Sequence, residues 1–252
     1  LGAIFADIII PYDYGIKQVI PDRLQGPSLK HLFGTDDLGR DLFSRVIHGS
    51  RSSLVLGILT TAVATLIGGF LGGICAYYGN RVDNIIMRLL DVITSIPSTL
   101  LSLSIVAALG PGIRNLVIAI TVSRVPTFAR VIRSAVLNIV NQEYIEAAKA
   151  GGTRNLRIML RHVYPNAMSP IIVQCTMSIS QLILQAAGLS FLGMGMQPPA
   201  PEWGALLNSA RDFMRTAPHL MLFPGIAIVL AALAFNLVGD GLRDAFDPRL
   251  KS

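Results

Sequence analysis

The sequence predicts an all-α integral membrane protein, because hydrophobic residues are abundant, charged residues are scarce and charges are absent from long windows. Hydrophobic residues make up 52% of the 252 residues, and charged residues 14%, against roughly 25% in an ordinary globular domain. The mean hydropathy is +0.57. Asp, Glu, Lys and Arg are absent from four windows: Ser52 to Asn80, Val92 to Ile113, His162 to Pro201, and Thr216 to Gly239.

Each window is long enough to cross a bilayer as a helix. About 20 helical residues span the ~30 Å hydrocarbon core, where lipid offers the backbone no hydrogen-bond partners. A buried helix of a large soluble protein would explain one such window but not all of them. A further span is expected from Asn115 to Asn138. There Arg130 and Arg133 lie near one end and can extend to the interface, which leaves Arg124 near the middle.

The expected architecture is five complete spans after the end of a first helix. Residues 1–10 are apolar but too short to span, and without the basic start of a signal peptide they look like the end of a first transmembrane helix. Residues 11–51 are expected as an extracytoplasmic loop with an interfacial helix, 52–240 as the transmembrane domain and 241–252 as a cytoplasmic tail. The five spans are expected at Ser52–Tyr78, Arg88–Leu109, Asn115–Asn138, Met168–Gly193 and Pro218–Gly239.

Basic residues favour one orientation. If the loop from Glu143 to Arg161 is cytoplasmic, then Gly79–Ile86 and the tail after Asp240 are cytoplasmic too. Lys and Arg then number eleven inside and nine outside, and six of those nine lie between Pro11 and Arg51. The formal charge of +6 is interpreted as an orientation signal rather than a nucleic-acid surface, because the basic residues fall mainly in loops and at helix ends.

The first complete span carries two overlapping pairs of small residues, Gly68 with Gly72 and Gly69 with Gly73. Such spacing lets another helix approach closely. The two cysteines of the chain both lie within expected spans, where a free cysteine behaves as a small apolar residue, and their spacing predicts neither a disulfide framework nor a metal site.

The polar run from Gly34 to Asp41 has acidic residues spaced somewhat like those of a calcium loop. An EF-hand also needs a Glu at the end of its loop, where Val46 or Ile47 stands here. A capped helix from Asp37 to His48 on the membrane surface is the expected structure instead.

Two short helices are expected between Asn141 and Pro165. Asn141 can cap the first, good helix formers fill Glu143 to Ala150, and Gly151-Gly152 ends it. Thr153 can cap the second, which Pro165 is expected to close.

The two helices differ in the surfaces that they offer. The first places Glu146 beside Ala147 and Ala148, small residues that let a partner surface come close. The second is amphipathic, as expected of a helix that lies along a membrane surface. Its basic face is formed by Arg154, Arg157 and Arg161, and its apolar face by Leu156, Met159, Leu160 and Val163.

This loop resembles the EAA loop of permeases from binding-protein-dependent ABC importers. The resemblance rests on Glu146-Ala147-Ala148, Gly152 and Pro165, and it extends over Lys30 to Leu250 toward the C-type subunit of the dipeptide, oligopeptide and nickel permeases. One departure is Tyr164, where the family usually has Leu or Phe. Further matching runs are Gly34 to Asp41, Val82-Asp83-Asn84, Met87-Arg88, Ala129-Arg130, Arg157 to His162, Ser190 to Gly193, Gln197-Pro198-Pro199, Trp203-Gly204 and Phe235 to Asp244.

The resemblance implies a non-catalytic permease subunit in the bacterial inner membrane that imports dipeptides or oligopeptides. Its implied partners are a paralogous permease subunit, two cytoplasmic ATPases that bind ATP and Mg²⁺, and an extracytoplasmic solute-binding protein. This chain has no Gly-x-x-x-x-Gly-Lys-Ser/Thr phosphate loop, so no cofactor is expected on it. The residues implied in coupling to the ATPases are Glu143, Glu146, Ala147, Ala148, Gly152, Arg154 and Pro165.

The sequence leaves several alternatives open. Arg124 could contact a peptide carboxylate, pair with Asp91 or brace a helix interface.

A nickel permease would need metal contacts, yet His162 and His219 are expected on opposite sides of the membrane, and no metal ligands are assigned. Met194 and Met196 are expected as apolar filling. A secondary transporter working without ATP would tend to carry intramembrane acids, which the uncharged windows lack. A membrane scaffold would tolerate changes in the loop 141–165.

Overall fold

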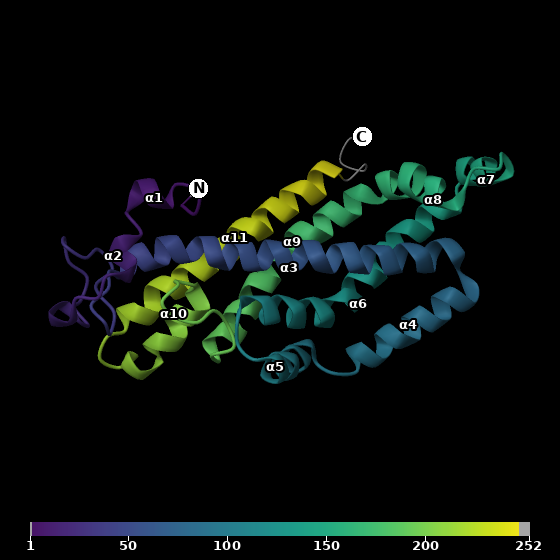
Figure 1. Ribbon diagram of the computed structural model, residues 1–252. Helices are drawn as coiled ribbons and strands as arrows, with labels where there is room; N and C mark the ends of the chain where they lie inside the picture. The colour runs from purple at the N-terminus through teal and green to yellow at the C-terminus, as the bar shows by residue number, and fades with distance from the viewer. Residues whose placement is uncertain (1, 247–252) are drawn as a thin grey trace. The chain divides into compact units, whose positions relative to one another are not determined.

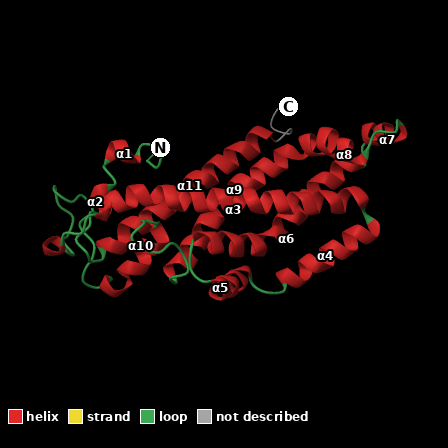
Figure 2. Ribbon diagram, viewed as in Figure 1, coloured by secondary structure: helices red, strands yellow, loops and turns green. Residues whose placement is uncertain are grey.

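The computed structural model describes residues 2–246, which form helices and loops and contain no strand (Figure 2). Of the expected tail 241–252, residues 241–246 form the end of the last helix and the remainder lies outside the described residues. Figure 1 shows the elements in chain order. The short helices are α1 (Ala6–Ile9), α2 (Asp13–Ile16), η1 (Ile20–Asp22), α7 (Glu143–Ala150), α8 (Asn155–Ile158), η2 (Met159–Val163), α10 (Trp203–Ala210) and η3 (Arg211–Phe213). The longer helices are α3 (Leu42–Tyr78), α4 (Asn80–Thr94), α5 (Ser98–Leu109), α6 (Ile113–Val140), α9 (Tyr164–Phe191) and α11 (His219–Phe246).

The described residues divide into two compact units. The first contains the residues up to Leu59 together with Leu103–Ala119 and Ser180–Ala234, and the second contains Thr60–Ser102, Ile120–Ile179 and the residues from Phe235 on. Every loop that the sequence places outside the cell belongs to the first unit, and every loop that it places inside belongs to the second.

Four helical segments are long and apolar enough to cross a membrane: Leu42–Tyr78, Ile113–Val140, Asn155–Phe191 and His219–Phe246. Apolar side chains on them are exposed, such as Leu66 at 73% and Leu237 at 63%. Large apolar side chains left on the surface of spanning helices are expected to face lipid or a partner subunit. The described part of the chain therefore has the helices of a multi-pass membrane protein.

The span expected from Arg88 to Leu109 is not one straight helix. The structure has two helices here, α4 and α5, which meet at an angle of 80°. Pro97 lies in the break, where it supplies no backbone N–H and disfavours the helical conformation of Ile96. The pair would be a fifth, broken span if both helices lie in the membrane.

The separate interfacial helix expected from Asp37 to His48 is also absent, so this prediction is wrong. Residues 37–41 form a turn, and the helix begins at Leu42 and continues without a break to Tyr78. Asp41 caps it by accepting a hydrogen bond from the Ser44 backbone N–H, 2.8 Å from its carboxylate oxygen. No proline follows within this helix to stop it, so it extends into the span.

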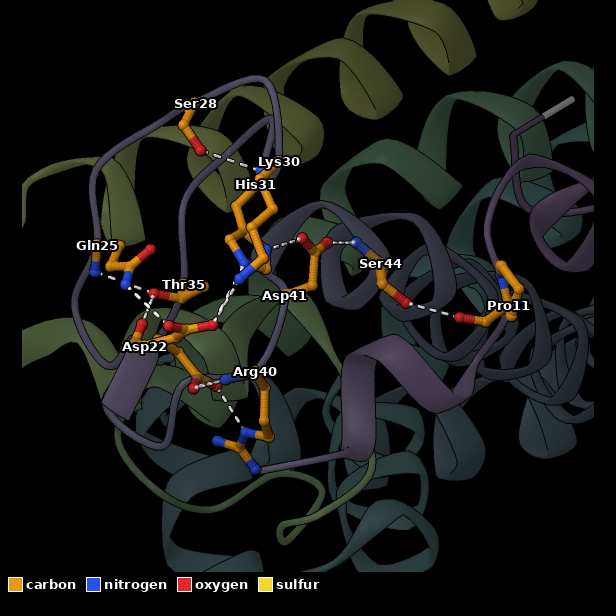
Figure 3. Close-up of polar contacts among 11 residues, drawn as sticks. Pro11, Asp22, Gln25, Ser28, Lys30, His31, Thr35, Arg40, Asp41 and Ser44 are labelled. Carbon is orange, nitrogen blue, oxygen red and sulfur yellow. Dashed lines mark hydrogen bonds and ion pairs between the residues drawn. The ribbon is translucent and has the colours of Figure 1, made fainter. Parts of the chain in front are cut away.

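A polar network in the first unit holds the run from Gly34 to Asp41 in place (Figure 3). Asp36 accepts hydrogen bonds from the backbone N–H of Arg40 at 2.9 Å and from its Nε at 2.6 Å. Asp41 also lies 2.8 Å from Nδ1 of His31. Nearby, Lys30 lies 2.9 Å from Asp22 and lowers the pKa of that carboxyl. These carboxylates are engaged by protein groups, and no group of three potential metal ligands occurs among residues 2–246.

In the second unit the glycine pairs of α3 allow other helices to approach closely, as their spacing predicts. A Cβ at position 68 would lie 2.7 Å from Cβ of Phe128, and one at position 72 would collide with the Ala129 carbonyl oxygen, both on α6. A Cβ at position 73 would collide with the Tyr164 hydroxyl of α9. The close approach of other helices to α3 is confirmed, and two different helices use it.

Two ion pairs fasten α4 to α6. Arg133 binds Asp83 through two nitrogens, with its Nε 2.6 Å from one carboxylate oxygen, and Arg130 lies 2.6 Å from Asp91. The apolar contacts between these helices centre on Leu90, which is 4% exposed. Arg130 and Arg133, expected to extend to the membrane interface, are therefore held by acids of the neighbouring helix.

Candidate functional site

The loop between α6 and α9 forms a compact element, which we call the coupling element and define as residues 141–165. Its first helix is α7, which projects beyond the ends of α6 and α8 (Figure 1). The cap position is Gln142 rather than Asn141, and its side chain makes no capping hydrogen bond. The helix ends at Gly151-Gly152 as expected, and Gly152 adopts a φ of +73°, which favours glycine over residues with a Cβ.

One face of α7 is anchored and the other is open. Ile145 is completely buried, in a cluster with Val140 and Ile158. Glu146 and Ala147 are exposed, and Ala148 is half-buried against the same cluster. The structure thus presents a carboxylate and a small side chain on a helix that is anchored through its buried apolar side chain. Glu143 lies in the first turn of this helix and is exposed as well.

The second helix of the coupling element does not end at Pro165. It begins as α8 with Arg154 at the cap position, so Thr153 is not the cap, and it runs through a π-helical turn, η2, into α9. In this turn the backbone N–H of Tyr164 donates to the Met159 carbonyl. Proline has no N–H to give to a helical ladder, and the wide turn just before it lets the backbone continue past Pro165 without that bond.

The expected apolar face of this second helix is divided in the structure. Met159 and Val163 are buried in the cluster around Ile145, whereas Leu156 and Leu160 are exposed at 68% and 61%. The exposed leucines share their surface with the three arginines of the expected basic face. Together these residues line an open concavity of about 850 Å³: Gly151, Gly152, Thr153, Arg154, Leu156, Arg157, Leu160 and Arg161.

Two tyrosines tie the coupling element to α3, and sequence patterns identified neither as functional. Tyr77, at the end of α3, donates a hydrogen bond from its hydroxyl to Oδ1 of Asn155 at 2.9 Å, and Nζ of Lys149 lies 5.1 Å from its ring centroid. Tyr164 donates from its hydroxyl to the Gly69 carbonyl at 3.1 Å. The one sequence feature that pointed to these contacts was Tyr164 itself, which stands where the permease family usually has Leu or Phe.

Arg124 lies on α6, apart in sequence from the coupling element, and is half-buried. Asp91, considered from the sequence as its partner, forms its ion pair with Arg130. His162 belongs to the second unit and His219 to the first, where a Cβ on Gly34 would lie 2.8 Å from the imidazole of His219. The structure therefore does not assemble the histidines considered for nickel into a site within either unit.

Comparisons with known proteins identify relatives of this chain. The family model described as "Binding-protein-dependent transport system inner membrane component" matches residues 65–252. The chain is 48% identical over 252 residues to the dipeptide transport system permease protein DppC of Alkalihalophilus pseudofirmus, covering 100% of this chain and 83% of that protein. It is 46% identical over 255 residues to the di/tripeptide permease DppC of Pseudomonas aeruginosa, covering 99% of this chain and 84% of that one. It is 47% identical over 251 residues to the glutathione permease GsiD of Pectobacterium atrosepticum, covering 99% and 83%.

Solved structures share the fold at lower identity. An inward-facing structure of the MetNI methionine ABC transporter superposes with a TM-score of 0.65 at 18% identity, covering 80% of this chain and 95% of that one. An amino acid ABC transporter with histidines gives 0.59 at 20% identity, covering 82% and 95%. The chain thus belongs to the family of inner membrane components of binding-protein-dependent transport systems, as a multi-pass permease subunit of an ABC importer that works with ATPase subunits.

Proposed function

We propose that this permease imports dipeptides or oligopeptides, and that a cytoplasmic ATPase drives it by docking on α7. The observation that carries the docking proposal is the construction of the coupling element. Glu146 and Ala147 are exposed on a short helix whose opposite side is buried through Ile145. A helix that is anchored on one side and open on the other can pass the displacement of a docked partner into the chain behind it.

Each coupling residue has a role in this proposal. Glu143 and Glu146 offer carboxylates to basic groups of the ATPase, and Ala147 and Ala148 leave room for its surface to approach. Gly152 makes the turn between the two helices with its positive φ. Arg154 offers a cation at the rim of the concavity, and Pro165 follows the π-helical turn that connects the element to α9.

The energy for transport enters from outside this chain, which is a non-catalytic subunit. Its sequence has no phosphate loop, so ATP and Mg²⁺ bind to the ATPase subunits and not here. Closure of the two ATPases on ATP displaces α7, and the displacement passes through the coupling element into α3 and α9. The spans then change between inward-open and outward-open arrangements, a population shift between two states of the permease.

The proposed assembly contains a second, paralogous permease subunit and an extracytoplasmic solute-binding protein that delivers the cargo. Peptide cargo is supported by the relatives named as dipeptide, di/tripeptide and glutathione permeases. Nickel is the alternative cargo. Arg124 is the candidate for contact with a peptide carboxylate inside the pathway, because it is a half-buried cation near the middle of α6.

The docking proposal is tested with the assembled importer in proteoliposomes. Replacing Glu146 with Ala, or Ala147 with Trp, is expected to lower ATP-driven uptake about tenfold or more, the effect of losing ~1.4 kcal/mol of docking energy. Asp212→Ala is the matched control, since Asp212 is exposed and belongs to the other unit. Unchanged uptake in both variants would indicate a scaffold role for the loop, and uptake that persists without ATPase subunits would indicate a secondary transporter.

Cargo and pathway are tested in the same vesicles. Dipeptides, tripeptides and Ni²⁺ are compared as substrates with the cognate binding protein present, and peptide uptake without Ni²⁺ uptake is the expected result. Arg124→Ala is expected to weaken the apparent affinity for peptides, and Arg124→Lys to keep part of it. An unchanged affinity and substrate preference in Arg124→Ala would remove Arg124 from the pathway.

A further inference from the structure

Tyr77 occupies a position between the end of α3 and both halves of the coupling element. Its side chain is enclosed, with only 9% of the residue exposed, and it packs in the same apolar cluster as Ile145 and Ile158. The hydroxyl donates to Asn155, the first residue of α8, at 2.9 Å. The face of the ring lies under the ammonium group of Lys149, in α7, at 5.1 Å from the ring centroid.

These two polar contacts reach opposite sides of the Gly151-Gly152 turn. Lys149 lies before the turn and Asn155 after it, so one side chain of α3 contacts both helices that the turn joins. The apolar contacts of Ile145 and Ile158 in this cluster have no directional preference and permit small rotations of α7. A hydrogen bond and an ammonium group over a ring face do constrain direction. Tyr77 therefore makes directional contacts from the end of α3 to both α7 and α8.

We propose that Tyr77 is a positioning residue that converts the displacement of α7 by the docked ATPase into movement of α3. The inference rests on the proposed coupling function and adds the residue through which the force reaches this span. Without the Tyr77 hydroxyl, the ATPase still docks on α7 and still hydrolyses ATP, but α7 rotates about its apolar contacts instead of moving α3. ATP hydrolysis is then uncoupled from transport.

The contact is suited to a test that leaves the fold intact. Asn155 is exposed, so its side-chain oxygen can bond to water when the tyrosine hydroxyl is removed. Tyr77→Phe keeps the ring, its place in the cluster and the face under Lys149, and it removes only the hydrogen bond to Asn155. Tyr78→Phe is the matched control, because that neighbouring ring packs edge-on against Tyr77 at 5.2 Å and Tyr78 is exposed.

The measurement is the number of peptides imported per ATP hydrolysed by the complete importer in proteoliposomes. We expect Tyr77→Phe and Asn155→Leu each to lower this ratio by about fivefold, the factor that one typical hydrogen bond contributes to an equilibrium. The double variant should be no worse than either single one, as required of two residues that act through one contact. Asn155→Asp keeps an acceptor oxygen and should retain the ratio, as should Tyr78→Phe.

Additive losses in the double variant, or a normal ratio in Tyr77→Phe, would overturn the inference. Asn155→Leu provides the same test from the exposed side if Tyr77→Phe inserts poorly. The Glu146→Ala variant separates this inference from the docking proposal. If Glu146→Ala uncouples the importer and Tyr77→Phe does not, only the role of Tyr77 is wrong; if neither does, the docking proposal is wrong as well.

Discussion

The hydroxyl of Tyr164 on α9 donates a hydrogen bond to the backbone carbonyl of Gly69 on α3, at 3.1 Å. It reaches that carbonyl over Gly73, where no side chain occupies the space. Tyr164 directly follows the π-helical turn of the coupling element. The element is therefore held to α3 at two places, by Tyr77 at the turn between α7 and α8 and by Tyr164 at the start of α9.

Gly73→Ala tests this second fastening. The added Cβ collides with the Tyr164 hydroxyl, so we expect a loss of about 1–3 kcal/mol of stability, as in other overpacked interiors. The apparent melting temperature of the purified complex measures the loss. Adding Tyr164→Leu to Gly73→Ala should recover most of it, because the hydroxyl that collides is then absent. A normal melting temperature in Gly73→Ala would show that α9 does not pack this closely.

The two ion pairs between α4 and α6 should differ in strength. The side chains of Arg133 and Asp83 are 32% and 18% exposed, whereas those of Arg130 and Asp91 are 45% and 63% exposed. Asp83→Ala is expected to cost about 2 kcal/mol, between the ~0–1 kcal/mol of exposed pairs and the ~3–5 kcal/mol of buried ones. Asp91→Ala is the matched comparison and should cost about 1 kcal/mol or less. Equal losses, measured by thermal unfolding, would contradict this ranking.

Glu202 is a buried acid whose removal should destabilise the first unit. It is 1% exposed and caps α10 by accepting from the backbone N–H of Gly204 at 2.8 Å and of Ala205 at 2.9 Å. The Ser53 hydroxyl also donates to it, at 3.2 Å. Glu202→Ala leaves these donors without an acceptor and is expected to cost about 2–3 kcal/mol. Glu202→Gln keeps one acceptor oxygen and should lose less; an equal loss in both would argue against the capping role.

The sequence predicts most of the long spans and the bounds of α7, because both depend on local patterns. Hydropathy reports whether a segment can lie in lipid, and the glycine pair at 151–152 ends α7 by a local backbone requirement. Hydropathy does not report the direction in which a helix runs. The bend at Pro97 between α4 and α5 therefore leaves no mark in the hydropathy of this uncharged window. The missed start of α3 has a similar cause, since Asp37 and Asp41 are both acceptable caps and only the folded turn selects Asp41.

The contacts that fasten the site could not be predicted, because they join residues far apart in the sequence. Tyr77 and Asn155 meet only after α4 to α7 have folded between them. The division of the apolar face of α8 and η2 has another reason. A face assigned with about 3.6 residues per turn does not hold through a π-helical turn, which leaves Leu160 exposed while Val163 is buried.

The most direct test of the central claim, that an ATPase docks on α7, is photo-crosslinking in the assembled importer. A photo-crosslinking amino acid is placed at Ala147, and as a control at Leu29, which is fully exposed in the first unit. Mass spectrometry then identifies the attached subunit. The account predicts that the probe at position 147 attaches to an ATP-binding subunit and that the probe at position 29 does not. Attachment of the 147 probe to lipid or to a permease alone would contradict it.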